Sequence, residues 1–588
     1  MILQALTSLY EALAQKGEIS KEGWSREKIS FALSIDEEGN LLRVTPLFDT
    51  VDGPKGKTRE VPQKMTVPAA VKRTSGAAAN FLWDNSSYIL GVSLKKGEDD
   101  AEREKRRNKD IKCFEACREL HHSMLDGMEY PAAKAVLNFL DKWEPQKAEE
   151  NNLVAQYAKE ILSGANMVFR FNGGYVHDDP QLASVWQKAN AKQKDNIGQC
   201  LITGALDAIP NTHPTIKGVQ GAQSSGAALV SFNASAFCSY NKEQNQNAPV
   251  GKYAAFAYTT ALNHLLADRK NVHRIGDAAV VCWAENADKQ YEDFAAEVFF
   301  GDNVDKSDEQ RLSALRTSLK LLADGLPCKE MDLDPDRKFY ILGLSPNAAR
   351  IAVRFFYCDS FGKIAGNIYK HHERLEIVRP SYDKFPILPL WKLLSATVNP
   401  NAKDKTPNAA MAGAVARAVF SGGRYPASLL ECTFLRIKAE RNITRERAAI
   451  IKAYYLRNPN EKCPKEVLTV SLNENSKNIP YTLGRLFSVY EEIQQAANPG
   501  INTTIKDRYF GSAAAMPATV FPILSNLAQK HLRKLSDAQR VYLDKKVMTL
   551  KSVLGEQYPA HMSLPEQGSF DLGYYHQTQA RYTKKEDK

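Results

Sequence analysis

The chain has 588 residues, a formal net charge of +10, 43% hydrophobic residues and 25% charged residues. This composition is ordinary for a soluble globular protein, and the length is too great for one hydrophobic core, so we expect about three packed units. No apolar run approaches the roughly 18–20 residues of a membrane span, which argues against a membrane-spanning helix. The N-terminus shows no basic leader or cleavage site, so we expect a cytoplasmic protein.

The positive charge is concentrated in the C-terminal third of the chain. Residues 386–588 hold 29 Lys and Arg against 17 Asp and Glu, whereas the rest of the chain holds 49 against 51. Such an asymmetry is typical of a surface that binds a polyanion. The alternative is a solvated helical surface with many salt bridges. The nine cysteines are scattered without a CxxC pair, so we expect free, mostly buried thiols rather than zinc ligands.

The first hundred residues predict a mixture of helix and strand. Apolar residues recur at helical spacing over residues 1–17, and residues 28–47 alternate apolar and polar side chains around a Gly-Asn turn, as in a β-hairpin. Residues 67–94 indicate two short strands around a Gly/Ala turn. The mixed-charge run at residues 95–112 predicts a solvated helix or a mobile loop.

The central part of the chain also mixes helices and strands. Helical patterns cover residues 113–163 and 253–268, and strand patterns occur at residues 167–176, 278–285 and 339–359. A Ser-Pro-Asn turn splits the last of these into a pair of strands. Because strands and helices do not alternate regularly, we do not expect a Rossmann-like parallel sheet.

Helices dominate after residue 385. Apolar stripes at residues 483–493, 521–535 and 543–554 indicate a helical bundle, and Ser536 with Gln539 predicts a capping box before the third stripe. We therefore expect an α+β fold, in which an irregular mixed N-terminal region precedes an all-α bundle. The predicted parts are an N-terminal α+β unit at residues 1–130, a central α+β unit at residues 131–385 and a helical region at residues 386–588.

Residues 211–251 form a glycine-rich stretch with many neutral polar side chains and few charges. Carboxamides both donate and accept hydrogen bonds and can read base edges, whereas lysines and backbone N–H groups hold phosphate. The alternative is a solvated loop. Apolar residues within the stretch predict an ordered loop anchored on a packed scaffold; they are Leu229, Val230, Phe232, Phe237 and Tyr240.

Motifs for catalysis are absent or broken. There is no HExxH sequence, and the run GAQSSGA at residues 221–227 lacks the spacing of a GxSxG nucleophile elbow. His371, His372 and Glu373 are adjacent in the chain and therefore face apart, so they do not predict a metal site. We expect no enzymatic activity, no metal and no cofactor.

Four blocks of sequence, at residues 1–19, 71–91, 213–250 and 254–266, carry a family resemblance. In this order along the chain, they resemble the large subunit of the type I-C CRISPR Cascade surveillance complex. The resemblance implies a non-catalytic subunit of an RNA-guided antiviral ribonucleoprotein. In that family the large subunit recognises the protospacer-adjacent motif in double-stranded DNA, promotes duplex opening and R-loop formation, and recruits a separate helicase-nuclease that degrades the target.

The resemblance also implies a set of partners. These are the CRISPR RNA, the target double-stranded DNA with its displaced single strand, the backbone, handle-binding and small subunits of Cascade, and the helicase-nuclease; a membrane is not among them. Residues 483–588 resemble the small subunit, which lines the strand-holding belly of such complexes.

With this family in view, we expect DNA contacts from three regions. In the 211–251 stretch, Gly218, Gly221 and Gly226 would allow close backbone approach, and the contacting residues are Gln220, Gln223, Ser224, Ser225, Asn233, Lys242, Gln244 and Asn245. In the second block, the phosphate-binding candidates are Lys72, Arg73, Thr74 and Ser75, and the groove-binding candidates are Asn80 and Asn85. In the C-terminal bundle, the candidates for the nucleic-acid backbone are Arg485, Lys506, Arg508, Lys530, Arg533, Lys534, Lys545 and Lys546.

Each of these assignments has an alternative. Turn formation would account for Asn80 and Asn85, and core packing would account for Phe81, Trp83 and Tyr88. Two other functions also stay open. A metal-dependent nuclease with dispersed ligands would use His177 and Asp178, and a purely structural assembly subunit would use its basic bundle only to bind its partners.

Overall fold

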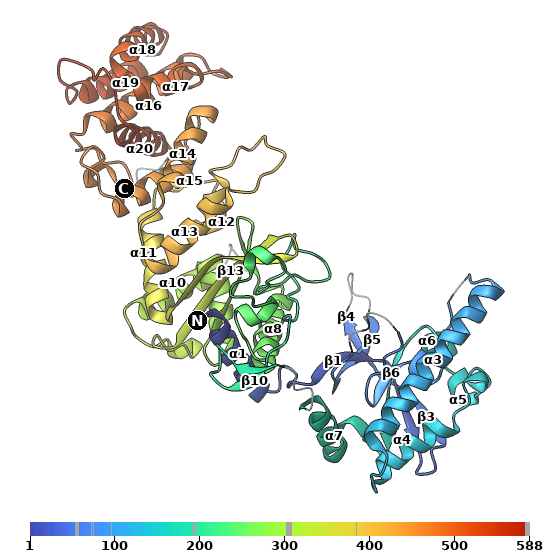
Figure 1. Ribbon diagram of the computed structural model, residues 1–588. Helices are drawn as coiled ribbons and strands as arrows, with labels where there is room; N and C mark the ends of the chain where they lie inside the picture. Colours follow the sequence, from blue (N-terminus) through green and yellow to red (C-terminus); the bar gives the residue numbers. More distant parts are fainter. Residues whose placement is uncertain are drawn as a thin grey trace. The chain divides into compact units, whose positions relative to one another are not determined.

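The computed structural model of the protein describes residues 1–52, 58–71, 73, 76–95, 97–191, 196–301, 309–383 and 385–582 (Figure 1). The chain forms two compact units. Unit 1 contains Met1, Leu3–Pro214 and Ser231–Ala261, and unit 2 contains Ile2, Thr215–Val230 and Leu262–Lys588. The 211–251 stretch is therefore divided between the two units.

Unit 1 contains a mixed sheet with the hairpin that the sequence predicts. Strand β2 (Phe31–Ile35) pairs antiparallel with β3 (Leu41–Pro46) and parallel with β7 (Asn166–Phe171). Strand β7 also pairs with β6 (Trp83–Asn85) and β8 (Gly174–Tyr175). The predicted hairpin at residues 28–47 and the strand pair at residues 167–176 are confirmed.

Two smaller strand groups complete the sheets of unit 1. Strand β5 (Thr58–Pro68) pairs antiparallel with β1 (Trp24–Ile29) and with β4 (Phe48–Asp52). Strands β9 (Ile197–Gln199) and β10 (Leu206–Ala208) form a hairpin.

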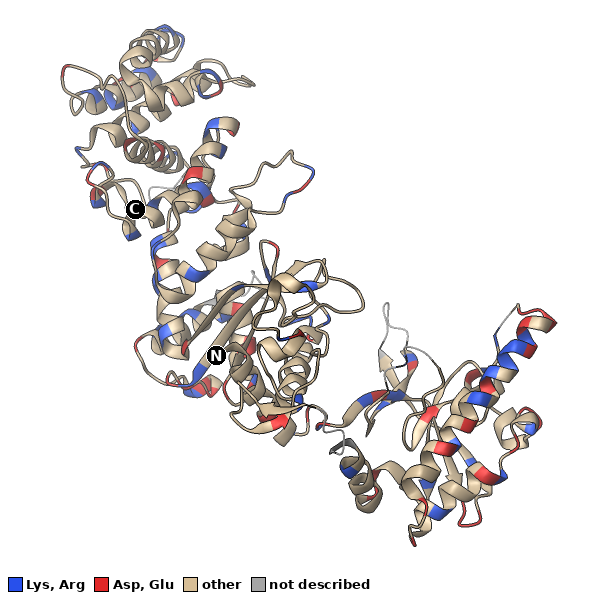
Figure 2. Cartoon of the chain, in the orientation of Figure 1, with Lys and Arg blue, Asp and Glu red and all other residues tan. Residues whose placement is uncertain are grey.

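The helices of unit 1 are α1 (Ile2–Gln15), α2 (Ser86–Ile89), α3 (Asp100–Leu125), α4 (Pro131–Lys142), α5 (Asn152–Ala155), α6 (Ala158–Ile161), α7 (Pro180–Ala191) and the first part of α8 (Lys252–Ala267). Helices α2, α4 and α5 contact strands of the mixed sheet, whereas α1 packs on α8, with the rings of Tyr10 and Phe256 5.6 Å apart. The mixed-charge run forms the start of α3, along which basic and acidic residues are interspersed (Figure 2). The end of α3 is buried, because Cys113, Phe114 and Cys117 join the core under the sheet.

Residues 67–94 differ from the predicted pair of strands. Strand β5 reaches Pro68 at the start of this segment, and after the Gly/Ala turn the second predicted strand is limited to the three residues of β6, which the short helix α2 follows. The cause is local, because the Asn85 side chain accepts a hydrogen bond from Ser87 N at 3.0 Å and caps α2. Core packing is confirmed for the aromatic residues of this segment, and Phe81 is fully buried.

Unit 2 begins with an antiparallel sheet. Its order is β11 (His273–Ile275), β12 (Ala278–Ala284), β13 (Lys338–Asn347) and β14 (Arg350–Ser360), so the predicted strands at residues 278–285 and 339–359 are confirmed. Ser345 and Pro346 lie within β13, and the turn falls two residues later, at Ala348 with φ 53°. Helices α9 (Lys289–Ala295) and α11 (Phe361–Leu375) contact this sheet, and α10 (Glu309–Ala323) packs on α11. The ring centroids of Phe339 in β13 and Phe361 in α11 lie 5.0 Å apart.

The rest of unit 2 is mostly helical. The helices are α12 (Leu390–Ser395), α13 (Ala409–Ser421), α14 (Ala427–Glu440), α15 (Arg445–Arg457), α16 (Ile479–Ala497), α17 (Ile505–Ala515), α18 (Pro517–Leu532), α19 (Asp537–Lys551) and α20 (Leu564–Ala580). The predicted stripes are confirmed in α16, α18 and α19, whose apolar faces form the bundle core. The predicted capping box is wrong, because Ser536 Oγ hydrogen-bonds to Gln539 Oε1 at 3.3 Å instead of to the backbone of α19.

These elements give an α+β fold with a mixed N-terminal part and a mostly helical C-terminal part, as the sequence predicts. The finer division at residues 130 and 385 stays a prediction. The nine cysteines are free thiols, and most of them are buried. Within the described ranges, no helix combines the length and the apolar character needed to cross a bilayer.

Candidate nucleic-acid interface

The 216–227 loop of unit 2 holds the first group of candidate DNA-reading residues. Ile216 and Ala227 exchange backbone hydrogen bonds of 2.8 and 2.9 Å and close the loop. Ala228 joins it to the β13–β14 turn, because its carbonyl accepts from Ile351 N at 3.0 Å. The Asn263 side chain of α8 holds the entering strand of the loop with hydrogen bonds of 2.8 and 3.1 Å. The base of the loop is therefore attached to both a sheet and a helix.

The tip of the 216–227 loop exposes four neutral polar side chains, those of Gln220, Gln223, Ser224 and Ser225. The three glycines of the loop, Gly218, Gly221 and Gly226, have φ values of 93°, 85° and 107°. Residues that carry a side chain rarely adopt such positive φ values. At the third of them, Gly226, a Cβ would come within 2.5 Å of the Thr215 hydroxyl. Gly226 thus allows a close approach within the protein itself. The resulting tight turn presents the polar side chains outward.

Asn245 in unit 1 is not available for a DNA contact, contrary to the sequence-based expectation. It is 3% exposed. Its Oδ1 accepts from His213 Nε2 at 2.8 Å, and its amide donates to the carbonyls of Pro210 at 2.9 Å and Val250 at 3.1 Å. Tyr258 OH lies 2.6 Å from His213 Nδ1, so His213 connects Tyr258 and Asn245 in one hydrogen-bonded chain. Burial lowers the pKa of His213, which favours its neutral form. Asn245 therefore holds the segment in place.

Three candidates in the same segment, Asn233, Lys242 and Gln244, are exposed. The Asn247 amide fixes the turn that carries Lys242 and Gln244 by donating to the carbonyls of both residues, each at 3.0 Å. This clamp is a positioning feature that the sequence reading missed, because no local pattern distinguishes Asn247 from its exposed neighbours.

The expectation that Phe237 and Tyr240 anchor this segment is wrong. Phe237 is 43% exposed and Tyr240 is 95% exposed. Tyr240 has φ 54° in a tight turn, and the turn directs its ring outward. An exposed aromatic ring on a hydrogen-bonded turn is a further surface on which a base can stack.

Arg73 is engaged within unit 1 rather than free for phosphate. Its guanidinium forms an ion pair with Asp84, its Nε donates to Ala78 O at 2.8 Å, and it lies 4.0 Å from the centre of the Tyr88 ring. Burial raises the pKa of the Asp84 carboxyl, and the hydrogen bond from Arg73 opposes that shift. The Arg73 guanidinium thus compensates the charge of the buried Asp84 carboxylate.

The asparagines of the second block also have internal roles. Asn80 is 3% exposed, and its Oδ1 accepts from Val71 N at 2.9 Å. Since Asn85 caps α2, turn formation and capping account for both residues, and the groove-binding assignment is wrong for the buried Asn80. Lys72, Thr74 and Ser75 lie outside the described residues.

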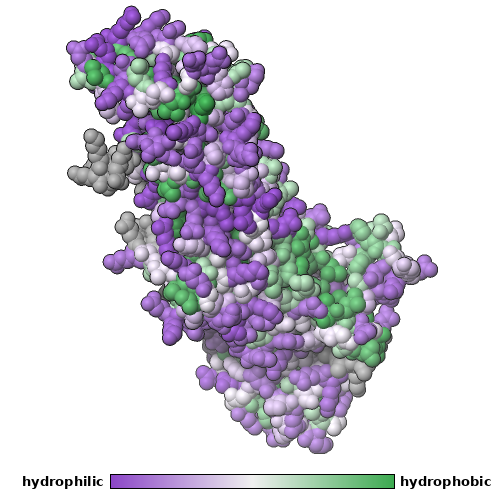
Figure 3. Space-filling model, turned by 90° about the vertical axis from the view of Figure 1, so that its left-hand side faces the viewer, coloured by the Kyte–Doolittle hydropathy of each residue, from purple (hydrophilic) through white to green (hydrophobic). Residues whose placement is uncertain are grey.

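The basic candidates of the C-terminal bundle fall into two groups. The exposed ones are Arg508, Lys530, Arg533, Lys534 and Lys545. Lys506 and Lys546 are partly buried. Lys506 Nζ donates to Asn442 Oδ1 at 3.3 Å, and Lys546 is ion-paired with Glu492 at 3.4 Å. Figure 3 shows that the surface of these helices is mostly hydrophilic, with smaller apolar patches between.

Arg485 is buried, unlike the exposed basic residues of the bundle, and this contradicts the prediction that it contacts the nucleic-acid backbone. It is 8% exposed, and its guanidinium donates to Gln577 Oε1 at 3.1 Å and to the carbonyls of Asn473 at 3.2 Å and Glu474 at 3.1 Å. Burial lowers its pKa. Arg485 therefore links α16 to α20 and to the segment before α16, and it does not face solvent where phosphate would bind.

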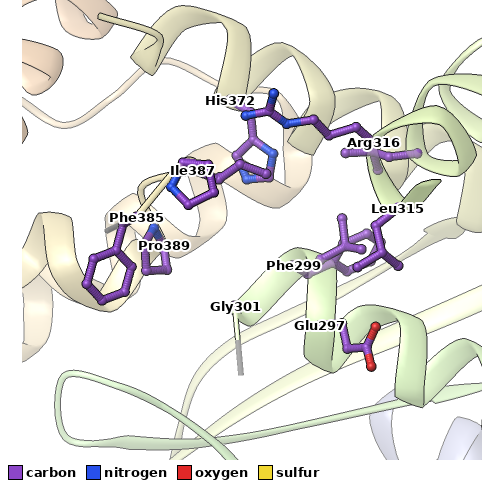
Figure 4. Close-up of a pocket in the computed structure, with 12 residues that line it drawn as sticks. Glu297, Phe299, Gly301, Leu315, Arg316, His372, Phe385, Ile387 and Pro389 are labelled. Carbon is purple, nitrogen blue, oxygen red and sulfur yellow. The ribbon is translucent and has the colours of Figure 1, made fainter. Parts of the chain in front are cut away.

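An apolar cavity of about 60 Å³ in unit 2 lies between Phe299, Leu315 and Ile387, with Arg316 and His372 on one side (Figure 4). Burial and the Arg316 guanidinium lower the pKa of His372 to about 4, so this histidine is neutral at pH 7. Glu297 also lines the cavity, and its carboxylate forms an ion pair with Arg311. In the nuclease alternative, His177 is only 1% exposed, and the described part of the chain contains no group of three or more side chains that could hold a metal ion.

Comparison with known families decides the assignment. The model of a family described as CRISPR-associated protein (Cas_Csd1) matches residues 6–582. The chain belongs to this family. The resemblance carried by the four sequence blocks is thereby confirmed, and the protein is a large subunit of a CRISPR Cascade complex. No curated protein matches the chain. A Csd1-family subunit works within a multi-protein complex, so its exposed polar loops and basic surfaces are candidate contacts for nucleic acid and for neighbouring subunits.

Proposed function

We propose that this Csd1-family subunit recognises the protospacer-adjacent motif of double-stranded DNA within a type I-C complex, promotes duplex opening and R-loop formation, and recruits a helicase-nuclease. The observation that carries the proposal is the 216–227 loop. It exposes Gln220, Gln223, Ser224 and Ser225 on a base attached to a sheet and a helix. Carboxamides suit base-edge recognition, and a protein that relies on guide pairing need only read a short duplex motif.

Within the proposal, Gln220 and Gln223 are the main readers, and Lys242 with Gln244 forms a second contact group. The exposed basic residues of the bundle hold the nucleic-acid backbone without regard to sequence, because contacts to phosphate oxygens carry no sequence information. We further propose that the subunit is non-catalytic and that the recruited helicase-nuclease degrades the target. The burial of His177, the candidate ligand of the nuclease alternative, supports this part of the proposal.

The test is binding of the assembled complex to guide-matched duplexes that carry either the correct motif or a scrambled one. Gln223→Ala should weaken binding to the correct motif by about 1–3 kcal/mol and leave binding to the scrambled motif unchanged. The matched control is Gln181→Ala, since Gln181 is an exposed glutamine on α7, away from the loop in sequence. Lys242→Ala is measured separately, because Lys242 and Gln223 belong to different units.

Two outcomes would overturn parts of this proposal. If neither Gln223→Ala nor Gln220→Ala changes the preference for the correct motif, the 216–227 loop is not the reader. If the isolated subunit cleaves strands in a metal-dependent manner, it is not a non-catalytic subunit.

A further inference from the structure

A depression of about 440 Å³ lies beside the 216–227 loop in unit 2. The backbone at Gly218 and the side chain of Gln220 form one part of its wall, and Leu266 at the end of α8 forms another. The loop packs closely here, because a Cβ on Gly218 would lie 3.1 Å from the Leu266 Cβ. The position of Gln220 relative to the depression is therefore set by packing as well as by the hydrogen bonds at the base of the loop.

Two arginines, Arg269 and Arg274, line the same depression, and both are exposed. Arg274 lies on β11, where its neighbours in the strand are buried and its backbone pairs with Ala279 of β12. Arg269 lies in the turn after α8. The Asp268 carboxylate next to it accepts hydrogen bonds from Lys270 N at 3.2 Å and from the side-chain amide of Asn271 at 3.1 Å, so it is used to form the turn.

In the described lining of the depression, two arginines stand against one acidic residue. Asp277 is the one acidic residue in its described lining, and Asp277 is ion-paired with Arg354 at 2.8 Å. Among the residues that the structure describes, neither Arg269 nor Arg274 is ion-paired with a carboxylate. Exposed guanidinium groups in a concave wall favour a bound anion, and guanidinium binds phosphate oxygens in a bidentate manner.

We propose that Arg269 and Arg274 bind phosphates of the DNA duplex whose base edges face the 216–227 loop. This inference rests on the proposed function, because it places the phosphate-binding arginines beside Gln220, which is proposed to contact base edges. The chemistry is that of a phosphodiester backbone: two fixed cations hold the duplex in register, and the neutral carboxamides reach its groove. Neither arginine belongs to the basic C-terminal third, so overall charge asymmetry gives no indication of this site.

The test compares the assembled complex containing Arg269→Ala/Arg274→Ala with wild type, on guide-matched duplexes over a range of salt concentrations. Binding should weaken equally for correct and scrambled motifs, and the slope of log affinity against log salt should fall by about 2, because each lost phosphate contact removes about 0.9. The matched control is Lys320→Ala/Lys329→Ala, which removes two exposed positive charges that lie outside the basic C-terminal third. Arg269→Lys/Arg274→Lys should restore most of the slope, because the charges return.

An unchanged affinity and salt slope in the double alanine variant, in a complex that assembles normally, would overturn the inference. So would saturable binding of inorganic phosphate that requires both arginines but leaves duplex binding unchanged, since that result identifies a small-anion site. Failure of the proposed function gives a different result, because loss of motif preference is measured with Gln223→Ala, and the arginine variant should retain that preference.

Discussion

Gly484 on α16 and Gly573 on α20 allow these two helices to pack backbone against backbone. A Cβ on Gly484 would collide with the carbonyl oxygen of Phe570, and a Cβ on Gly573 would collide with that of Tyr481. Both obstacles are main-chain atoms, so a flexible side chain cannot move aside to relieve the clash. The contact places the last described helix of the chain in the core of the bundle.

This packing predicts that Gly573→Ala is strongly destabilising. Inserting a methyl group into a close-packed helix contact typically lowers the free energy of unfolding by about 1–3 kcal/mol. Chemical denaturation of the purified protein measures the change. Gly511 on α17 provides the control, because a Cβ there would meet open space and Gly511→Ala should stabilise the helix by roughly 0.5–1 kcal/mol. Equal effects at both positions would contradict the role assigned to the contact.

His121 predicts a loss of stability in acid. It is fully buried, its Nε2 accepts from Leu82 N at 2.9 Å, and burial lowers its pKa to about 4. Because an unfolded histidine has a pKa of about 6.5, the stabilisation is complete above that pH and is lost as the pH falls from about 6.5 towards 4, by up to about 3 kcal/mol. Thermal unfolding between pH 7 and pH 4.5 measures this. His121→Leu should be less stable at pH 7 but should show a shallower decline in acid.

The adjacent His122 predicts the opposite sign. Hydrogen bonds to Asp141 at 2.9 Å and Asp126 at 2.8 Å raise its pKa. Its contribution is present below about pH 6.5 and is lost as the pH rises through the raised pKa. The effect is small, because the histidine is partly exposed and its ion pairs are screened. His122→Ala should therefore lower the melting temperature slightly at pH 6 and less at pH 8.5; the reverse order would contradict the assigned pairing.

Substitution of Asn245 should change thermal stability, whereas substitution of its exposed neighbours should change DNA binding. Asn245→Ala removes the partner of His213 Nε2 and leaves the carbonyls of Pro210 and Val250 without their donor. Unsatisfied buried polar groups cost about 1–3 kcal/mol, so the melting temperature should fall. Lys242→Ala is the control, since Lys242 is exposed and its side chain should leave thermal stability unchanged. A stable Asn245→Ala protein with weakened DNA binding would restore Asn245 as a contact residue.

Arg485 and Lys545 should differ in the same way. Arg485→Ala removes the donor to two backbone carbonyls and to Gln577, so we expect a lower free energy of unfolding by about 1–3 kcal/mol. Lys545 is exposed on α19, so Lys545→Ala should preserve stability. It should weaken DNA binding for all sequences alike and reduce the salt slope by about 0.9. Denaturation and salt-dependent binding of both variants separate the two roles.

Local sequence patterns predicted much of the fold. The alternation around Gly39 and Asn40 predicted the β2–β3 hairpin, and the apolar stripe through Leu483 and Phe487 predicted α16. These predictions succeed because neighbouring residues alone set the side-chain periodicity of a strand or helix. The prediction for residues 67–94 failed because one capping side chain, Asn85, outweighed an ambiguous pattern.

Sequence patterns alone were sufficient to predict the α+β class, the helical stripes of the bundle and the family to which the chain is similar. Which polar residues face solvent depends instead on contacts between distant parts of the chain. Gln244 and Asn245 are adjacent and chemically alike, yet one is exposed and the other is buried against His213, which lies 32 residues away. Arg485 is likewise buried because its partner Gln577 lies 92 residues away. A polar side chain can be buried at low cost only where partners satisfy its hydrogen bonds. When those partners are this distant in the chain, local sequence patterns do not reveal them.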